Sequence, residues 1–199
     1  VTSYKTNDGI RTLILKRDEV QWHKLAEISN PEFDTIHYRN SADVAGDGKK
    51  YLLLGFVSRN QSRYLFAYSL SDAGARKIFS RGYNKLELQK LRTASGTVKS
   101  GIAFWDEEAD GIYNIDLVHW NGIDLEKANQ SRYLAGRVIP YYVNKLRQNP
   151  DDTISWYNLA KSFSRAGDKA NAARAVSLGL GRNPDEVLKS RFNSLKSEL

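Results

Sequence analysis

The chain has 199 residues, of which 41% are hydrophobic and 27% charged. This length can bury the core of one large domain or two small ones, and no apolar run approaches the ~20 residues that cross a bilayer as a helix. The chain holds no cysteine, which excludes disulfides, cysteine nucleophiles and thiolate metal sites. It begins at Val1 and holds no methionine, so we expect that the native start is missing and that any signal or lipidation segment has been removed.

The formal net charge is +7, which favours anionic partners such as nucleic acid, wall polymers or lipid headgroups. Residues 1–122 carry a net +2 and residues 123–199 a net +5, without any run of five Lys or Arg. Nucleic-acid-binding proteins usually cluster basic residues on one element, so this thin spread disfavours nucleic acid as the partner. Nucleic-acid binding stays an alternative, and it predicts a steep loss of affinity with salt.

The first 122 residues alternate apolar and polar side chains in short segments that Gly, Asn, Asp or Ser separate. This period of two predicts short strands joined by hairpins. Glu19–Ile28 is ambiguous between strand and helix, and a strand over Val20–Leu25 is weakly favoured. The other predicted strands cover residues 11–16, 50–56, 64–70, 85–91, 100–105 and 113–120.

An internal repeat relates two of these hairpins. A shift of 49 residues places Leu53 on Ile102 and Tyr64 on Tyr113 without a gap. Each copy has an apolar strand, a polar turn and an alternating strand that opens with Tyr. A closed propeller needs about four blades, so two copies predict a compact antiparallel sheet or sandwich instead.

After Gly122 the apolar residues recur at helical spacing. Asp124 is expected to cap a helix that opens at Leu125, and Pro140 is expected to kink or break that helix near residues 136–139. The sequence therefore predicts an α+β protein. Residues 1–122 form an antiparallel β domain with two hairpin units of about 49 residues, and residues 123–199 form a short helical domain.

Two further helices are predicted between the Asn-Pro pairs at 149–150 and 183–184. Gly167 and Asp168 supply the turn and the cap between them, and residues 187–199 form a terminal helix. The small or apolar positions along this stretch are Trp156, Leu159, Ala160, Phe163, Ala172, Val176 and Gly179.

This pattern resembles a tetratricopeptide (TPR) repeat. It departs from the family at Ala160 and Phe163, where Gly and Tyr are usual, and at Gly179, where a third Ala is usual. The resemblance implies a protein-binding helical hairpin whose first helix lines a groove. The flanking segments match the family only in part, so the groove would be short.

Four residues of that first helix would face the groove: Tyr157, Asn158, Lys161 and Arg165. One amide and two cations suit a peptide carboxylate or an acidic segment, which makes a protein or peptide the expected partner. The alternative is that Tyr157 packs on Tyr141 or Tyr142, and that Lys161 and Arg165 form a solvated face.

The segment Ala42–Phe56 resembles an FG-GAP/VCBS-type repeat, in which an Asp-rich turn leads into a strand ending in Gly and an aromatic. The resemblance implies an exported or lipid-anchored bacterial envelope protein, and calcium in the turn. Asp43 and Asp47 are present, but Ala45 and Tyr51 stand where the family usually has oxygen ligands. Two carboxylates would coordinate Ca²⁺ poorly, because this ion takes 6 to 8 oxygens.

A second acidic turn is the better candidate for a cation. Asp106, Glu108 and Asp110 stand at alternate positions and Asn114 follows, which offers oxygen ligands to Ca²⁺. The alternative is a solvated hairpin turn, because no Glu ends the loop to close it in bidentate fashion.

Residues for catalysis are not arranged in a recognisable pattern. His23, His37 and His119 show no HxH or HxxxH spacing and are expected to be half-exposed strand residues. The motifs GxSxG, GxGxxG and GxxxxGK[ST] are missing. Glu107 and Glu108 lie on an exposed turn, which would not raise a carboxyl pKa for glycoside chemistry. We therefore expect a protein that is not an enzyme.

The sequence thus predicts a non-enzymatic binding or assembly module of a bacterial cell-envelope protein. The resemblances imply an extracytoplasmic location and protein-protein interaction through the helices. One alternative is an accessory module that binds carbohydrate or an anionic wall polymer through exposed aromatics of the β domain, such as Trp105, Trp120 and Tyr113. Nucleic-acid binding is the second alternative.

Overall fold

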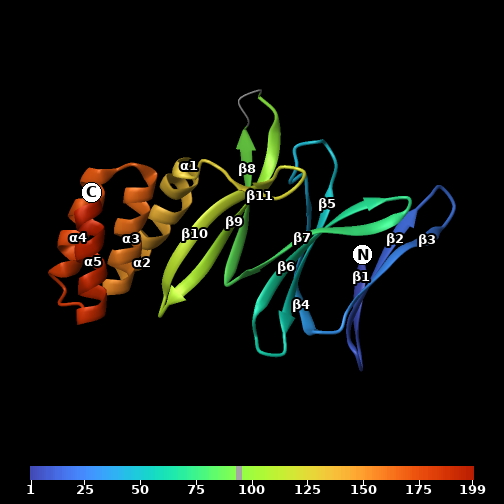
Figure 1. Ribbon diagram of the computed structural model, residues 1–199, viewed down its shortest axis with the longest axis horizontal. Coiled ribbons are helices and arrows are strands. Elements are labelled where there is room, and N and C mark those ends of the chain that lie inside the picture. The colour runs from blue at the N-terminus through green and yellow to red at the C-terminus, as the bar shows by residue number, and fades with distance from the viewer. Residues whose placement is uncertain (93–95) are drawn as a thin grey trace. The chain divides into compact units, whose positions relative to one another are not determined.

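The computed structural model describes residues 1–92 and 96–199. The chain forms two compact units. The strand unit comprises Val1–Trp105 and Val118–Lys127, and the helical unit comprises Asp106–Leu117 and Ala128–Leu199. Residues 106–117, which the sequence assigned to the β domain, therefore group with the helices. Antiparallel sheets precede the helices along the chain, as expected for the α+β class (Figure 1).

The strands of the described chain are arranged in three antiparallel sheets. The N-terminal sheet has the order β1-β2-β3, the central sheet β4-β5-β6-β7 and the C-terminal sheet β11-β10-β9-β8. Their bounds are β1 Thr2–Thr6, β2 Gly9–Arg17, β3 Trp22–Asn30, β4 Phe33–Ala42, β5 Tyr51–Ser58, β6 Arg63–Ser71, β7 Gly74–Tyr83, β8 Lys85–Arg92, β9 Val98–Ala109, β10 Ile112–Trp120 and β11 Leu125–Lys127.

The central sheet is buried on both faces. Leu53 of β5 lies in a core shared with Phe104 and Val118 of the C-terminal sheet. The next residue along β5, Leu54, lies in a second core with Ile14 of the N-terminal sheet. Successive side chains of a strand point to opposite faces, so the continuous apolar run at the start of β5 belongs to the middle layer of three.

Each predicted strand of the β domain overlaps an observed one, but β1, β4 and β7 were not predicted. The strands β4 and β7 are the two edges of the central sheet and carry polar residues, so their apolar alternation is weak. Strand β3 begins at Trp22, inside the ambiguous segment, and continues to Asn30.

The helix predicted to open at Leu125 is wrong. Leu125 instead starts β11 and pairs with Trp120 of β10. Its side chain packs against the core shared by the central and C-terminal sheets. The turn is held by the Asn121 side chain, which accepts hydrogen bonds from the backbone N–H groups of Ile123 and Asp124.

Helical structure begins at Ser131. The bounds are α1 Ser131–Tyr133, the π-helical turn η1 Leu134–Val138, α2 Ile139–Gln148, α3 Thr153–Ala166, α4 Lys169–Leu180 and α5 Glu186–Glu198. Pro140 lies in the first turn of α2, directly after η1. A proline cannot donate a backbone hydrogen bond, and the ladder shifts to π-helical spacing just before it, in the region where a kink was predicted.

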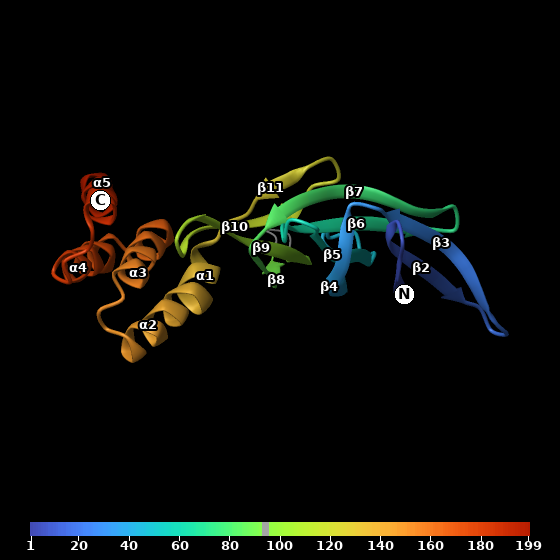
Figure 2. The ribbon, with the colours of Figure 1, turned by 90° about the horizontal axis from the view of Figure 1, so that it is seen from below.

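The helices α3, α4 and α5 form the body of the helical unit, and α3 contacts each of the other two (Figure 2). The predicted turn between α3 and α4 is confirmed, because Gly167 has a positive φ of 89° and Asp168 caps α4. Asp152 caps α3 and Asp185 caps α5, and each carboxylate accepts a backbone hydrogen bond from the first turn of its helix.

Close packing of the helices explains why α4 carries a glycine at position 179. A Cβ atom there would lie 2.4 Å from Cζ of Phe192 on α5 and 3.0 Å from Cβ of Trp156 on α3. The fully buried Phe192 ring fills the volume that an alanine methyl would need. The glycine at this position thus allows close contact of three helices.

We expect Gly179→Ala to destabilise the protein by about 1–3 kcal/mol, because overpacking against Phe192 and Trp156 outweighs the better helix propensity of alanine. Gly136→Ala in η1 is the matched control, since its Cβ meets nothing within 4 Å, and it should be neutral or stabilising. Urea unfolding of both variants measures the difference. A Gly179→Ala protein at least as stable as the parent would contradict the packing argument.

Acid should weaken the helical unit through its capping carboxylates. Burial raises the pKa of Asp152, but hydrogen bonds from Ser155 and the charge of Lys145 bring it below its ordinary value of 3.8. A carboxyl with a lowered folded-state pKa stabilises the fold above its unfolded pKa, and this contribution is lost as the pH falls through the folded-state value. We expect the free energy of unfolding of Asp152→Asn to fall less steeply than that of the parent below about pH 4.

The control for this pH series is Asp151→Asn, because the Asp151 side chain is 78% exposed and forms a surface ion pair with Arg182. Denaturant unfolding at several pH values gives the slopes. Equal slopes for the Asp152→Asn variant and the parent would show that the cap does not contribute to acid sensitivity.

Candidate binding surface on helix α3

Three of the four residues predicted to line the groove contact a segment of the same chain. Asn158, Lys161 and Arg165 follow one another along α3 at spacings of three and four, which places them on one helix face. Each makes hydrogen bonds to residues 106–117, the turn-forming ends of β9 and β10. We call this segment the acidic hairpin.

Asn158 binds the backbone of the acidic hairpin. Its Nδ2 donates to the carbonyl oxygen of Gly111 over 2.9 Å, and its Oδ1 accepts from the N–H of Tyr113 over 3.0 Å. The same Nδ2 donates to the carbonyl of Ile154 within α3. The side chain is buried, so these bonds satisfy backbone groups that are sheltered from water. An amide that bonds only backbone atoms recognises the shape of the turn and not its side chains.

Lys161 and Arg191 share the carboxylate of Glu108. The Lys161 ammonium lies 3.0 Å from one oxygen, and the Arg191 guanidinium of α5 lies 3.6 Å from the other. Glu107 accepts the N–H of Gly111 within the hairpin. The two cations thus bind one carboxylate of the acidic hairpin, that of Glu108.

Arg165 binds side chains on β10. Its Nη1 donates to Asn114 over 2.7 Å, and its Nη2 donates to the carboxylate of Asp116 over 3.1 Å and to Gln130 over 3.2 Å. The Asp116 side chain is only 10% exposed. A buried carboxylate needs such a partner, and the fork of the guanidinium supplies donors to several acceptors at once.

Tyr157, the fourth predicted residue, lies one helical turn before Lys161 on α3 and is buried against α5. Its ring meets Phe192 of α5 edge to face with centroids 5.3 Å apart, and burial raises its pKa. The alternative expected Tyr157 to pack on Tyr141 or Tyr142, whereas its ring contact is with Phe192; Tyr141 and Tyr142 meet each other edge to face. The edge-to-face contact with Phe192 thus helps to hold α3 against α5.

A hollow of about 350 Å³ remains open between α3 and α5. It adjoins the contacts with the acidic hairpin, since Lys161, Arg165 and Arg191 take part in both. The lining residues are Tyr157, Lys161, Ser164, Arg165, Ser190, Arg191, Ser194, Leu195 and Glu198.

The residues considered for calcium do not form a shared cluster. Of Asp106, Glu108, Asp110 and Asn114, the second is paired with Lys161 and the fourth accepts from Arg165. Among the described residues, no three His, Cys, Asp or Glu side chains come together in a way that could hold a metal ion.

The other acidic turn is organised by one of its own carboxylates. Asp43 accepts hydrogen bonds from the backbone N–H groups of Gly46, Asp47 and Gly48. Asp47 accepts from the hydroxyl of Tyr51 and the N–H of Lys49. Both carboxylates are thus used to hold the loop, and Tyr51 has a polar partner where the FG-GAP/VCBS resemblance expected a ligand.

The three histidines lie in three different sheets, on β3, β4 and β10. His23 contacts Asp18, His37 hydrogen-bonds the hydroxyl of Tyr83 and His119 faces Glu126. Burial lowers the pKa of His37 and of His119. Each histidine therefore has a local partner in its own region of the sheets.

Two of the aromatics considered for carbohydrate binding are buried. Trp105 is 1% exposed and Trp120 7% exposed, because both lie in the sheet cores of the strand unit. The ammonium of Lys85 covers the Trp105 ring at 4.1 Å. The prediction that these two tryptophans form an exposed sugar platform is wrong, since a sugar ring needs an open aromatic face.

Comparison of the chain with family models, curated proteins and solved structures finds no match. In the described parts of the chain, no helix combines the length and the apolar character needed to span a membrane.

The contacts that the sequence did not predict come from Glu108, Gly111, Tyr113 and Arg191. The sequence does hold one sign of these contacts, because an acidic turn and a cationic helix face occur in the same chain and have complementary charge. Lys161 and Glu108 lie 53 residues apart, and local patterns carry no information on such a pairing.

We expect Asn158→Ala to destabilise the protein by about 1–3 kcal/mol, because it leaves the Gly111 carbonyl and the Tyr113 N–H without their partner. Lys161→Ala removes a partly exposed ion pair and should cost less than about 1 kcal/mol. The control is Asn144→Ala on the exposed side of α2. Urea unfolding ranks the three, and a loss at Asn158 no greater than at Asn144 would contradict the assigned contact.

Proposed function

We propose that this chain is a non-enzymatic binding and assembly module of a bacterial cell-envelope protein, and that its TPR-like helices bind a protein partner. The partner presents an acidic, extended or turn-forming segment to the surface between α3 and α5. The envelope location rests on the FG-GAP/VCBS and TPR resemblances. The binding chemistry rests on the contacts of the helical unit.

The observation that carries this proposal is how α3 holds the acidic hairpin. Asn158 bonds both backbone groups of a turn, and Lys161 with Arg191 binds the carboxylate of Glu108. These are the elements of peptide recognition: backbone bonds give affinity, and charged side chains give selectivity. The helices therefore already bind one acidic segment, which lies in the same chain.

The hollow between α3 and α5 is the place for a second segment. Ser164, Ser190 and Ser194 add hydroxyl donors and acceptors around it, and Leu195 supplies an apolar wall. Arg191 reaches Glu108 only at 3.6 Å, which leaves room for a better aligned carboxylate. A volume of about 350 Å³ accommodates one or two side chains and not a large ligand.

Selection from a random peptide display library tests this proposal, followed by NMR mapping of a selected peptide on the whole chain. We expect acidic peptides to be enriched, and amide shifts at Ser190, Ser194 and Arg191. Ser194→Arg, which fills the hollow, should lower the affinity at least tenfold, roughly 1.4 kcal/mol.

The control is Ser177→Arg on the exposed part of α4, which adds the same charge away from the hollow. Equal affinities for the Ser194→Arg variant and the parent would refute the surface between α3 and α5. Enrichment of peptides without acidic residues would refute the proposed chemistry. Retention of the chain on a DNA column, lost steeply with salt, would favour the nucleic-acid alternative instead.

Carbohydrate binding through the β domain remains a second candidate, because another aromatic is open. Tyr64 is 38% exposed and lines a hollow of about 650 Å³ on the strand unit, together with Arg59 and Asn60. An open aromatic ring beside amide and guanidinium groups is suited to stack on a sugar and bond its hydroxyls.

A further inference from the structure

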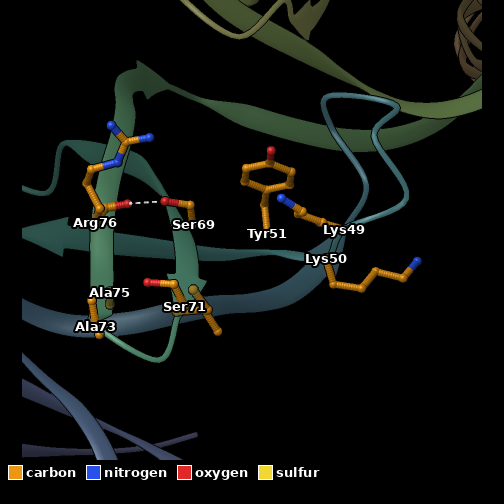
Figure 3. Close-up of a pocket in the computed structure, with 10 residues that line it drawn as sticks. Lys49, Lys50, Tyr51, Ser69, Ser71, Ala73, Ala75 and Arg76 are labelled. Atoms are coloured by element: carbon orange, nitrogen blue, oxygen red, sulfur yellow. Dashed lines mark hydrogen bonds between the residues drawn. The ribbon is translucent and has the colours of Figure 1, made fainter.

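A hollow on the strand unit is lined by three cationic side chains. It lies between the turn joining β6 to β7 and the start of β5, and its volume is about 410 Å³ (Figure 3). It is separate from the surface between α3 and α5. The lining residues are Lys49, Lys50, Tyr51, Ser69, Leu70, Ser71, Ala73, Gly74, Ala75 and Arg76.

Within the described chain, Lys49, Lys50 and Arg76 make no salt bridge. The nearby acid of the β6–β7 turn, Asp72, is taken by Lys16 of the N-terminal sheet. Three cations around one hollow repel one another unless an anion neutralises them. The electrostatic potential in the hollow is therefore positive and attracts anions.

The arrangement of the side chains is suited to a compact anion. Arg76 and Ser69 are cross-strand partners on β7 and β6, and the Ser69 hydroxyl donates to the Arg76 carbonyl over 3.3 Å. Figure 3 shows Lys49 lying beside the Tyr51 ring across the hollow from Arg76, whereas Lys50 points away. Arg76 and Lys49 thus flank the opening, and Lys50 adds charge at longer range.

The carboxylate nearest to these cations is already engaged. Asp47 accepts the Tyr51 hydroxyl over 2.9 Å and the Lys49 N–H over 3.0 Å. Burial raises the pKa of Asp47, but these bonds and the Lys49 charge lower it overall, so it is ionised at neutral pH. The charge of Asp43 also acts on the Tyr51 hydroxyl, so two carboxylates face three cations and the site keeps a net positive charge.

We propose that this hollow binds a phosphate group. The guanidinium of Arg76 offers two parallel donors, and the Lys49 ammonium offers a further one from the opposite side. A phosphate monoester has three terminal oxygens, two for the fork and one for the lysine, whereas a carboxylate has only two oxygens in all. The phosphate monoester belongs to a soluble molecule or to a lipid headgroup, which can carry the same group.

Calorimetric titration of the whole chain with glycerol phosphate and with inorganic phosphate tests the site, and flotation with phosphatidylcholine vesicles that contain phosphatidic acid tests the lipid source. The variant is Lys49→Gln/Arg76→Gln. The control is Arg174→Gln/Lys196→Gln, which removes the same charge from exposed positions on α4 and α5. We expect the first pair to lower the affinity at least tenfold and the control to change it less than about threefold.

Binding of a soluble phosphate that the first variant loses supports the site and identifies a soluble ligand. Vesicle binding that the same variant loses supports the site and identifies a lipid headgroup. Equal losses of affinity in the two double variants would show that only net charge matters, and would overturn the proposal. If the parent chain binds none of the three probes, the proposal is also overturned. If the Lys49→Gln/Arg76→Gln variant folds poorly, Ser71→Asp takes its place. This variant adds a negative charge to the hollow and should abolish phosphate binding.

Discussion

The amide of Asn158 is the contact on which the helical unit depends. Its two polar atoms match the carbonyl of Gly111 and the N–H of Tyr113, at the point where the acidic hairpin turns back on itself. Backbone groups at the end of a hairpin have no strand partner, so a side chain must satisfy them when they are buried. The ion pairs of Lys161, Arg165 and Arg191 are arranged around that contact and add charge selectivity to it.

The elements that could be predicted are those whose signal is local. The strands with clear apolar alternation, the capped turn at Gly167 and the terminal helix follow from neighbouring residues alone. Edge strands β4 and β7 were not predicted because they carry many polar residues and few buried ones, so their apolar alternation is weak. Leu125 was predicted to be helical because Asp124 is a good cap, but burial in the sheet core and pairing with β10 outweighed that preference.

For the candidate site, too, local sequence patterns predicted only part of the result. Asn158, Lys161 and Arg165 were predicted to bind an acidic segment, and they do contact one, but that segment comes from the chain itself. Helical spacing reveals which residues share a face and says nothing of what covers it. Gly179 is a similar case, because only the position of the Phe192 ring explains the absence of a methyl group there.

The division between the units crosses the chain three times, after Trp105, after Leu117 and after Lys127. Neither unit is therefore a continuous segment of the gene. A single recombination or proteolytic cut near residue 122 would leave the acidic hairpin on one piece and its binding face on the other, with Asn158 and Arg165 stripped of their partners. The helical unit is therefore complete only together with residues 106–117, which are inserted between two segments of the strand unit.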